Sequence, residues 1–130
     1  MSGQLCSFAN GNQLELLDHE RLDAYRVSVE LDGIVASLRR GSARGHAWLL
    51  DQVERASGSV VLNIAEGCGR TGADRARCLR IARGSLLEVD AGLTLLVNRG
   101  VIRGPTRAEA RMLSTRVVAM LTRLIARASI

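Results

Sequence analysis

The sequence has very few aromatic residues and almost no proline. Its 130 residues include one Phe, one Trp, one Tyr and one Pro, although 47% of them are hydrophobic. The core must therefore be built from aliphatic side chains. The hydrophobic content argues against a long disordered protein, and abundant Leu, Val, Ile and Ala with one proline favours helices. A chain of this length can form one domain without disulfides or metals.

Lysine is absent, and all 18 basic residues are arginines. The net charge is +5 and the isoelectric point is about 10.4. Arginine binds phosphate groups through a planar fork, so this composition favours a nucleic-acid partner. A second interpretation stays open, in which the arginines only solvate the outer faces of helices.

Sites that depend on cysteine or histidine are not indicated. Cys6, Cys68 and Cys78 form no CxxC pair, and His19 and His46 stand apart from them. This spacing argues against a metal site and against a disulfide framework, and we expect no cofactor. The chain starts with no secretory signal pattern and has no apolar run of about 18 residues, so we expect a cytoplasmic protein without membrane contact.

Apolar residues recur at helical spacing along most of the chain, which predicts four helices. We expect residues 1–17 to form a flexible tail, followed by helices at about 18–40, 46–66, 71–98 and 106–128. Connections this short join antiparallel neighbours. The predicted fold is an all-α, up-down-up-down four-helix bundle over residues 18–130.

Local signals predict where these helices begin and end. Gly67, Gly69 and Gly72 are expected to break the second helix directly after Glu66. The pairs Thr71/Asp74 and Thr106/Glu109 have the spacing of capping boxes, and Asp18 or His19 is a candidate cap for the first helix. We therefore expect a tight Gly-rich corner between the second and third helices.

Each predicted helix has one strong apolar stripe, which we assign to the core. In the third helix this stripe is the most regular, and it comprises Cys78, Leu79, Ala82, Leu86, Val89, Leu93 and Leu96. A second set of apolar residues lies off these stripes and is a candidate oligomer interface. It comprises Leu22, Tyr25, Val29, Trp48 and Leu62. Alternatively, Leu22 and Tyr25 only widen the core face.

Two motifs flank the Gly-rich corner, NIAEGCGR at residues 63–70 and LRIARGSLLEV at residues 79–89. With LDAYRVSVEL at residues 22–31, they resemble the four-helix-bundle proteins encoded in intervening sequences of bacterial 23S rRNA genes. The resemblance covers about residues 20–127. One departure is Val61, which stands where such proteins usually have a proline, so a kink expected there is in doubt.

The resemblance implies a small bundle that assembles into a ring, often a homopentamer, without an established biochemical activity. A related branch, the accessory proteins of diversity-generating retroelements, resembles a basic pentameric barrel that binds nucleic acid and a reverse transcriptase. The motif positions are assigned structural roles, because no nucleophile or base accompanies them. They are Asn63, Glu66, Gly67, Arg83 and Gly84.

Among these positions, Asn63 is expected to bond frayed carbonyls near a helix end. Glu66 is expected to pair with Arg70, Arg80 or Arg83. A close approach between helices would explain Gly84, because glycine is unfavourable inside a helix.

Two sets of arginines are the candidate nucleic-acid-binding residues, Arg77, Arg80 and Arg83 in the third helix and Arg116, Arg123 and Arg127 in the fourth. They could contact phosphates, and a ring would multiply such contacts. Alternatively, they pair with acidic residues of the first helix, within one subunit or between subunits, namely Glu20, Asp23, Glu30 and Asp32. We therefore expect a non-enzymatic, oligomeric protein that binds RNA or DNA as an accessory factor. The alternative is a scaffold whose ring docks a partner protein.

Overall fold

The computed structural model describes residues 17–40 and 45–129, and all regular structure in these ranges is helical. The predicted tail lies outside the described residues except for Leu17. The elements are the 3-10 turns η2 (Asp18–Arg21) and η3 (Leu38–Arg40) and the helices α1 (Asp23–Ser37), α2 (Ala47–Cys68), α3 (Gly72–Asn98) and α4 (Gly104–Ala128). The predicted all-α class is therefore confirmed.

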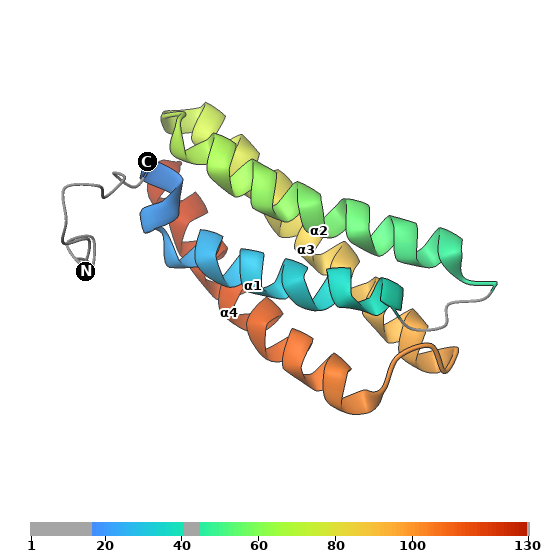
Figure 1. Ribbon diagram of the computed structural model, residues 1–130. Helices are drawn as coiled ribbons and strands as arrows, with labels where there is room; N and C mark the ends of the chain where they lie inside the picture. The colour runs from blue at the N-terminus through green and yellow to red at the C-terminus, as the bar shows by residue number, and fades with distance from the viewer. Residues whose placement is uncertain (1–16, 41–44, 130) are drawn as a thin grey trace, which may run out of the picture.

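The four helices run up, down, up and down around one core (Figure 1). Each helix packs against its neighbours in the chain, and α4 closes the bundle by packing against α1. The core is aliphatic, as the composition predicted. Its largest fully buried side chains are Leu31, Leu50, Ile64, Leu86, Leu93, Leu96, Leu121 and five valines.

The predicted apolar stripes are the buried faces. Every residue assigned to the stripe of the third helix, from Cys78 to Leu96, is buried in α3. The apolar spacing of the first and fourth helices also predicts core positions for Ile34, Met120 and Leu124, but these three residues lie at the rim instead. Ile34, Met120 and Leu124 are half-buried and pack against the core from its edge.

The first predicted helix is not continuous. Leu22 has an extended backbone, with φ −87° and ψ 130°, and separates the turn η2 from α1. Within η2, the amide of Leu17 donates to Glu20 Oε1 at 2.8 Å. Neither Asp18 nor His19 caps α1 as expected, because both residues belong to this separate turn.

Neither predicted capping box forms. Thr71 is the N-cap residue of α3, but its side chain makes no capping hydrogen bond. The fourth helix begins at Gly104, earlier than expected, and Pro105 lies in its first turn. Proline is favoured there because its fixed φ suits a helix and its missing amide is not needed. This early start places Thr106 inside α4.

The Gly-rich corner is present, but Gly67 is not part of the break. Helix α2 continues through Gly67 to Cys68, and Gly69 is its C-cap residue. A Cβ on Gly67 would lie 3.3 Å from both Cys78 Cβ and Leu79 Cδ2, so this glycine allows α2 and α3 to approach closely. The turn itself uses Gly72, whose φ of +56° is in the left-handed region.

Candidate nucleic-acid interface and the outer faces of the bundle

Arg77, Arg80 and Arg83 form a ridge on the exposed side of α3, which we call the α3 ridge. A spacing of three residues advances about 4.5 Å along a helix, so the ridge extends over about 9 Å. None of the three guanidinium groups makes a hydrogen bond or ion pair with any described residue. The ridge therefore presents three arginines that no internal partner holds.

Arg116, Arg123 and Arg127 are also exposed and also lack partners among the residues that the structure describes. They do not join the α3 ridge in one patch. Arg107 of α4 faces α3, because its Nη1 lies 2.9 Å from Asp90 Oδ1. Arg116 follows nine residues later, which is about 180° around the helix. Arg116, Arg123 and Arg127 therefore point away from α3 within one subunit.

The alternative pairing of these arginines with acidic residues of the first helix does not occur within the subunit. Glu20 accepts a hydrogen bond from the Leu17 amide, Asp23 pairs with Arg26 at 3.2 Å, and Asp32 accepts one from Ser57 Oγ at 2.7 Å. Glu30 makes no ion pair with a described residue. The six arginines therefore remain available for an external partner.

Charge is distributed unevenly among the four helices. Helix α4 carries five arginines against one glutamate, whereas α1 and α2 each carry three carboxylates against one arginine. Helix α3 lies between these extremes, with four arginines against three carboxylates. One side of the bundle is therefore basic and the other is mildly acidic.

An ion-pair cluster joins the two basic helices. Asp90 of α3 lies against Arg107 and, at 3.6 Å, against Arg111 of α4. Arg107 Nη2 also donates to Thr94 Oγ1 at 2.8 Å. Arg107 Nη1 and Asp90 Oδ1 are close in distance but are not aligned as a hydrogen bond. These two arginines hold the α3–α4 interface and are not free for phosphate.

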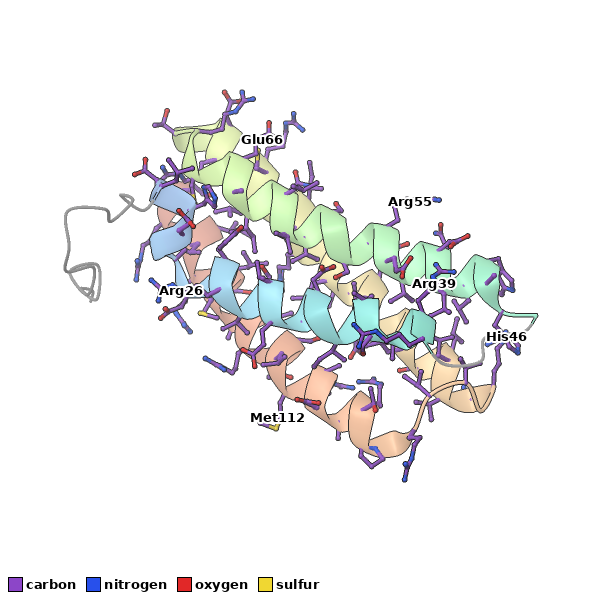
Figure 2. The ribbon with its side chains drawn as sticks, viewed as in Figure 1. Arg26, Arg39, His46, Arg55, Glu66 and Met112 are labelled. Atoms are coloured by element: carbon purple, nitrogen blue, oxygen red, sulfur yellow. The ribbon has the colours of Figure 1, made fainter. Side chains whose placement is uncertain are left out.

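Asn63 makes a different contact from the expected one, whereas Glu66 pairs with Arg70, one of its three predicted partners. Asn63 Nδ2 donates to the Ser59 carbonyl at 2.9 Å, one turn back, and not to frayed carbonyls at the helix end. Glu66 pairs with Arg70 at 2.9 Å, and both side chains are half exposed, so the pair is a surface pair that does not include Arg80 or Arg83. Figure 2 shows Glu66 projecting outward near the end of α2.

Gly84 does not lie at a close helix approach within the subunit. A Cβ there would meet nothing within 4 Å, and the position is exposed. The close approach is at Gly92 instead, where a Cβ would overlap Val53 Cγ2 of α2. In the sequence, Gly92 lies within the apolar stripe of the third helix, and this position could have indicated a close approach of two helices.

Arg75 has a structural role that the sequence analysis did not assign. Its Nε donates to the carbonyls of Gly67 at 3.0 Å and Arg70 at 2.7 Å, and its Nη2 donates to the carbonyl of Cys68 at 3.1 Å. Carbonyls at the end of a helix lack intrahelical donors. Arg75 supplies them and so fastens the corner between α2 and α3.

The candidate interface residues divide into two groups. Leu22 and Tyr25 are half-buried and pack against the edge of the core. Val29, Trp48 and Leu62 are 43%, 57% and 69% exposed. On α3 and α4 the structure adds four exposed apolar side chains that were not predicted, Ile81, Leu87, Leu95 and Met112.

The structure also bears on metals and membranes. Within residues 17–40 and 45–129, no three His, Cys, Asp or Glu residues come together in a way that could bind a metal ion. In the same part of the chain, no helix is both long enough and apolar enough to cross a membrane.

The chain was compared with models of known protein families. A family model described as 23S rRNA-intervening sequence protein matches residues 20–123, which include all four helices apart from the end of α4. No curated protein matches the chain.

Proposed function

The chain belongs to the 23S rRNA-intervening sequence protein family, and we propose that it binds the phosphate backbone of RNA or DNA without catalysing a reaction. We further propose that it acts as a ring of identical copies, a homopentamer, in an rRNA-related or ribonucleoprotein setting. The observation that carries this proposal is the α3 ridge, in which Arg77, Arg80 and Arg83 are exposed and unpaired.

Unpaired arginines suit this role for an energetic reason. Binding a phosphate through such a residue breaks no internal ion pair, and it releases counterions from the nucleic acid. Helix α3 contains no aromatic residue on which a base could stack. Binding is therefore expected to depend on charge and shape more than on base sequence. A ring presents the ridge several times, which multiplies the contacts.

The test is a reversal of the ridge, with Arg77, Arg80 and Arg83 all changed to Glu. Fluorescence anisotropy with a labelled RNA, repeated over a series of salt concentrations, gives the affinity and its salt dependence. We expect the reversed protein to lose binding. The milder Arg80→Gln variant should lower the slope of log K against log salt by about 0.7 to 0.9 for each copy in contact.

A matched control distinguishes the effect of the ridge on binding from the effect of net charge. Reversal of Arg116, Arg123 and Arg127 to Glu changes the charge of the chain by the same amount on another face of the bundle. It should weaken binding less than reversal of the ridge. Unchanged affinity after reversal of the ridge would refute the proposal.

A second candidate function is a scaffold whose ring docks a partner protein. The observation that favours it is Trp48, which is 57% exposed on α2, because tryptophan is enriched where proteins meet. The guanidinium of Arg99 lies 6.0 Å from its ring. In this case Trp48→Ala should break the assembly while circular dichroism shows the subunit still folded.

A further inference from the structure

The end of the bundle that carries Trp48 is basic. The chain passes from α1 to α2 and from α3 to α4 at this end, which lies at the right of Figure 1. We call it the Trp48 end. Its described residues, 37–40, 45–50 and 95–107, include five arginines and no Asp or Glu. Such a surface attracts an anionic partner.

Three of these five arginines keep a charge that no described carboxylate neutralises. Arg39 is not one of them, because it is bonded to Asp51 and Glu54. Arg107 is also excluded, since it lies against Asp90. The other three are exposed and form no ion pair with a described residue, namely Arg40, Arg99 and Arg103. The Trp48 end therefore stays basic after its ion pairs are counted.

Trp48 gives this basic end an aromatic surface. Its side chain is 57% exposed in the first turn of α2, and the guanidinium of Arg99 lies 6.0 Å from the centre of its ring. That distance is at the outer limit of a cation–π contact. The hydrogen bond from Arg99 Nη1 to the carbonyl of Leu95 is also long, at 3.4 Å. Arg99 is therefore held only loosely beside the indole.

A flat aromatic group can stack between Trp48 and Arg99. Atoms in contact lie about 3.5 Å apart, so a ring placed between the indole and the guanidinium needs about 7 Å. The present separation of 6.0 Å is short of this by about 1 Å, which a rotamer adjustment of the exposed Arg99 side chain supplies. Nucleobases stack in this way on aromatic rings and on the planar guanidinium of arginine.

Carboxylates limit this surface toward the middle of the bundle. Gln52 lies one turn after Trp48 and is bonded to Glu88 of α3 at 3.3 Å, so a negative charge stands on that side. Asp51 also follows Trp48, but it is engaged in the 2.6 Å ion pair with Arg39. A polyanion bound at Trp48 is therefore directed away from the middle of α2 and toward the three unpaired arginines.

We propose that Trp48 and Arg99 bind an unpaired base of a single-stranded nucleic acid, stacked between the indole and the guanidinium. Arg40 and Arg103, at the same end of the bundle, then contact its phosphates. Charge and aromaticity together identify this occupant. The unpaired arginines require negative charge and the exposed ring requires a flat apolar face, and a nucleotide supplies both in one unit.

The inference rests on the proposed function and deepens it, because it names single strands and unpaired loops as the preferred class of nucleic acid. A base inside a duplex cannot enter, since its neighbours in the stack cover both of its faces. Stacking tolerates every base, because each has a π face. The Trp48 end therefore selects unpaired bases and not a particular base sequence.

The test uses the fluorescence of Trp48, which is the only tryptophan in the chain. A base stacked on the indole quenches its emission. Oligouridine should quench the protein, whereas a duplex of oligouridine with oligoadenosine of the same length should not. In anisotropy with labelled oligouridine, Trp48→Leu should weaken binding about 5- to 150-fold, the loss of one stacked base, and Trp48→Phe should keep most of the affinity. Arg103→Gln should lower the salt slope by about 0.7.

Val29→Ala is the control, because it shortens an exposed apolar side chain on α1 and should leave the affinity unchanged. Circular dichroism confirms that each variant is folded. Unchanged fluorescence in a protein that binds oligouridine, or equal quenching by the duplex, would overturn the inference and leave the proposed function standing. A Trp48→Leu protein with a changed mass in light scattering but unchanged affinity would also overturn it and assign Trp48 to a protein interface. Quenching and affinity that both survive reversal of the α3 ridge would refute the role of the ridge and leave this inference standing.

Discussion

Gly92 of α3 lies directly against the side chain of Val53 of α2. A Cβ on Gly92 would overlap Val53 Cγ2, and both residues are buried. We therefore expect Gly92→Ala to destabilise the subunit by about 1 to 3 kcal/mol, the usual cost of overpacking a core. Urea denaturation measures this difference. Adding Val53→Ala should restore part of the loss, and two losses that simply add would contradict the contact.

Gly84→Ala should have the opposite effect on the stability of the subunit. A Cβ there meets nothing within 4 Å. Alanine is favoured over glycine in a helix by about 1 kcal/mol, so the variant should unfold at higher urea concentration. Both variants replace a helical glycine by alanine. The difference between their stabilities therefore measures the effect of the close approach at Gly92 apart from helix propensity. A destabilised Gly84→Ala protein would show that the position is constrained in a way that the subunit does not explain.

Arg75→Ala should destabilise the protein although Arg75 belongs to no core stripe. The variant removes the donor that serves the carbonyls of Gly67, Cys68 and Arg70. Leaving partly buried carbonyls without a partner costs about 1 to 3 kcal/mol. Arg77→Ala is the matched control, since Arg77 is exposed and unpaired, and its effect should stay within about 0.5 kcal/mol. Equal effects in both variants would refute the capping role.

Two ion pairs should differ in their contributions because they differ in burial. The side chains of Arg107 and Asp90 are 16% and 27% exposed, whereas those of Arg70 and Glu66 are each 50% exposed. Asp90→Ala leaves a mostly buried guanidinium without its partner and should cost about 3 kcal/mol. Glu66→Ala should cost about 1 kcal/mol or less, as for other surface pairs. A larger shift of the urea midpoint for Glu66→Ala than for Asp90→Ala would contradict this order.

Cys68 should react slowly at neutral pH. Burial raises the pKa of its thiol, and the nearby Arg75 only partly opposes this effect. The folded protein then holds the thiol proton more tightly than the unfolded chain does. The resulting stability is complete below the pKa of a free thiol, about 8.5, and falls as the pH rises above it.

Two measurements check the behaviour of Cys68. Alkylation by iodoacetamide, in a Cys6→Ser background, should be slower at pH 7.5 than for a free thiol. Between pH 7 and 10, the free energy of unfolding should fall more in the wild type than in Cys68→Ala. Alkylation as fast as that of a model thiol would refute the assignment.

The sequence predicted the elements that depend on periodicity. The buried stripe of α3 was assigned residue by residue, because a long, regular apolar pattern dominates the local preferences of individual residues. The helix ends were predicted less well. Thr71 and Thr106 stand at capping spacing, but hydrogen-bond geometry at a helix end depends on the backbone before it, which the spacing does not define.

The candidate site was predictable only in part. Exposure of the α3 ridge follows from its position relative to the core stripe, so it could be inferred. Whether two arginine sets share a face depends on how α4 is rotated against α3, and the contact of Asp90 with Arg107 is what reveals that rotation. A contact between residues of two different helices leaves no periodic pattern in the sequence, so it could not be predicted. Arg75 was missed for the same reason, since its partners are carbonyl groups and not side chains.

The even number of helices places both ends of the described chain at the same end of the bundle (Figure 1). Asp18 and Leu22 line the same small cavity as Leu124 of α4, which confirms that they are close. A short linker could therefore join the two ends, and new termini could be opened at the corner between Asn98 and Gly104. Such a circular permutant should keep every helix pair.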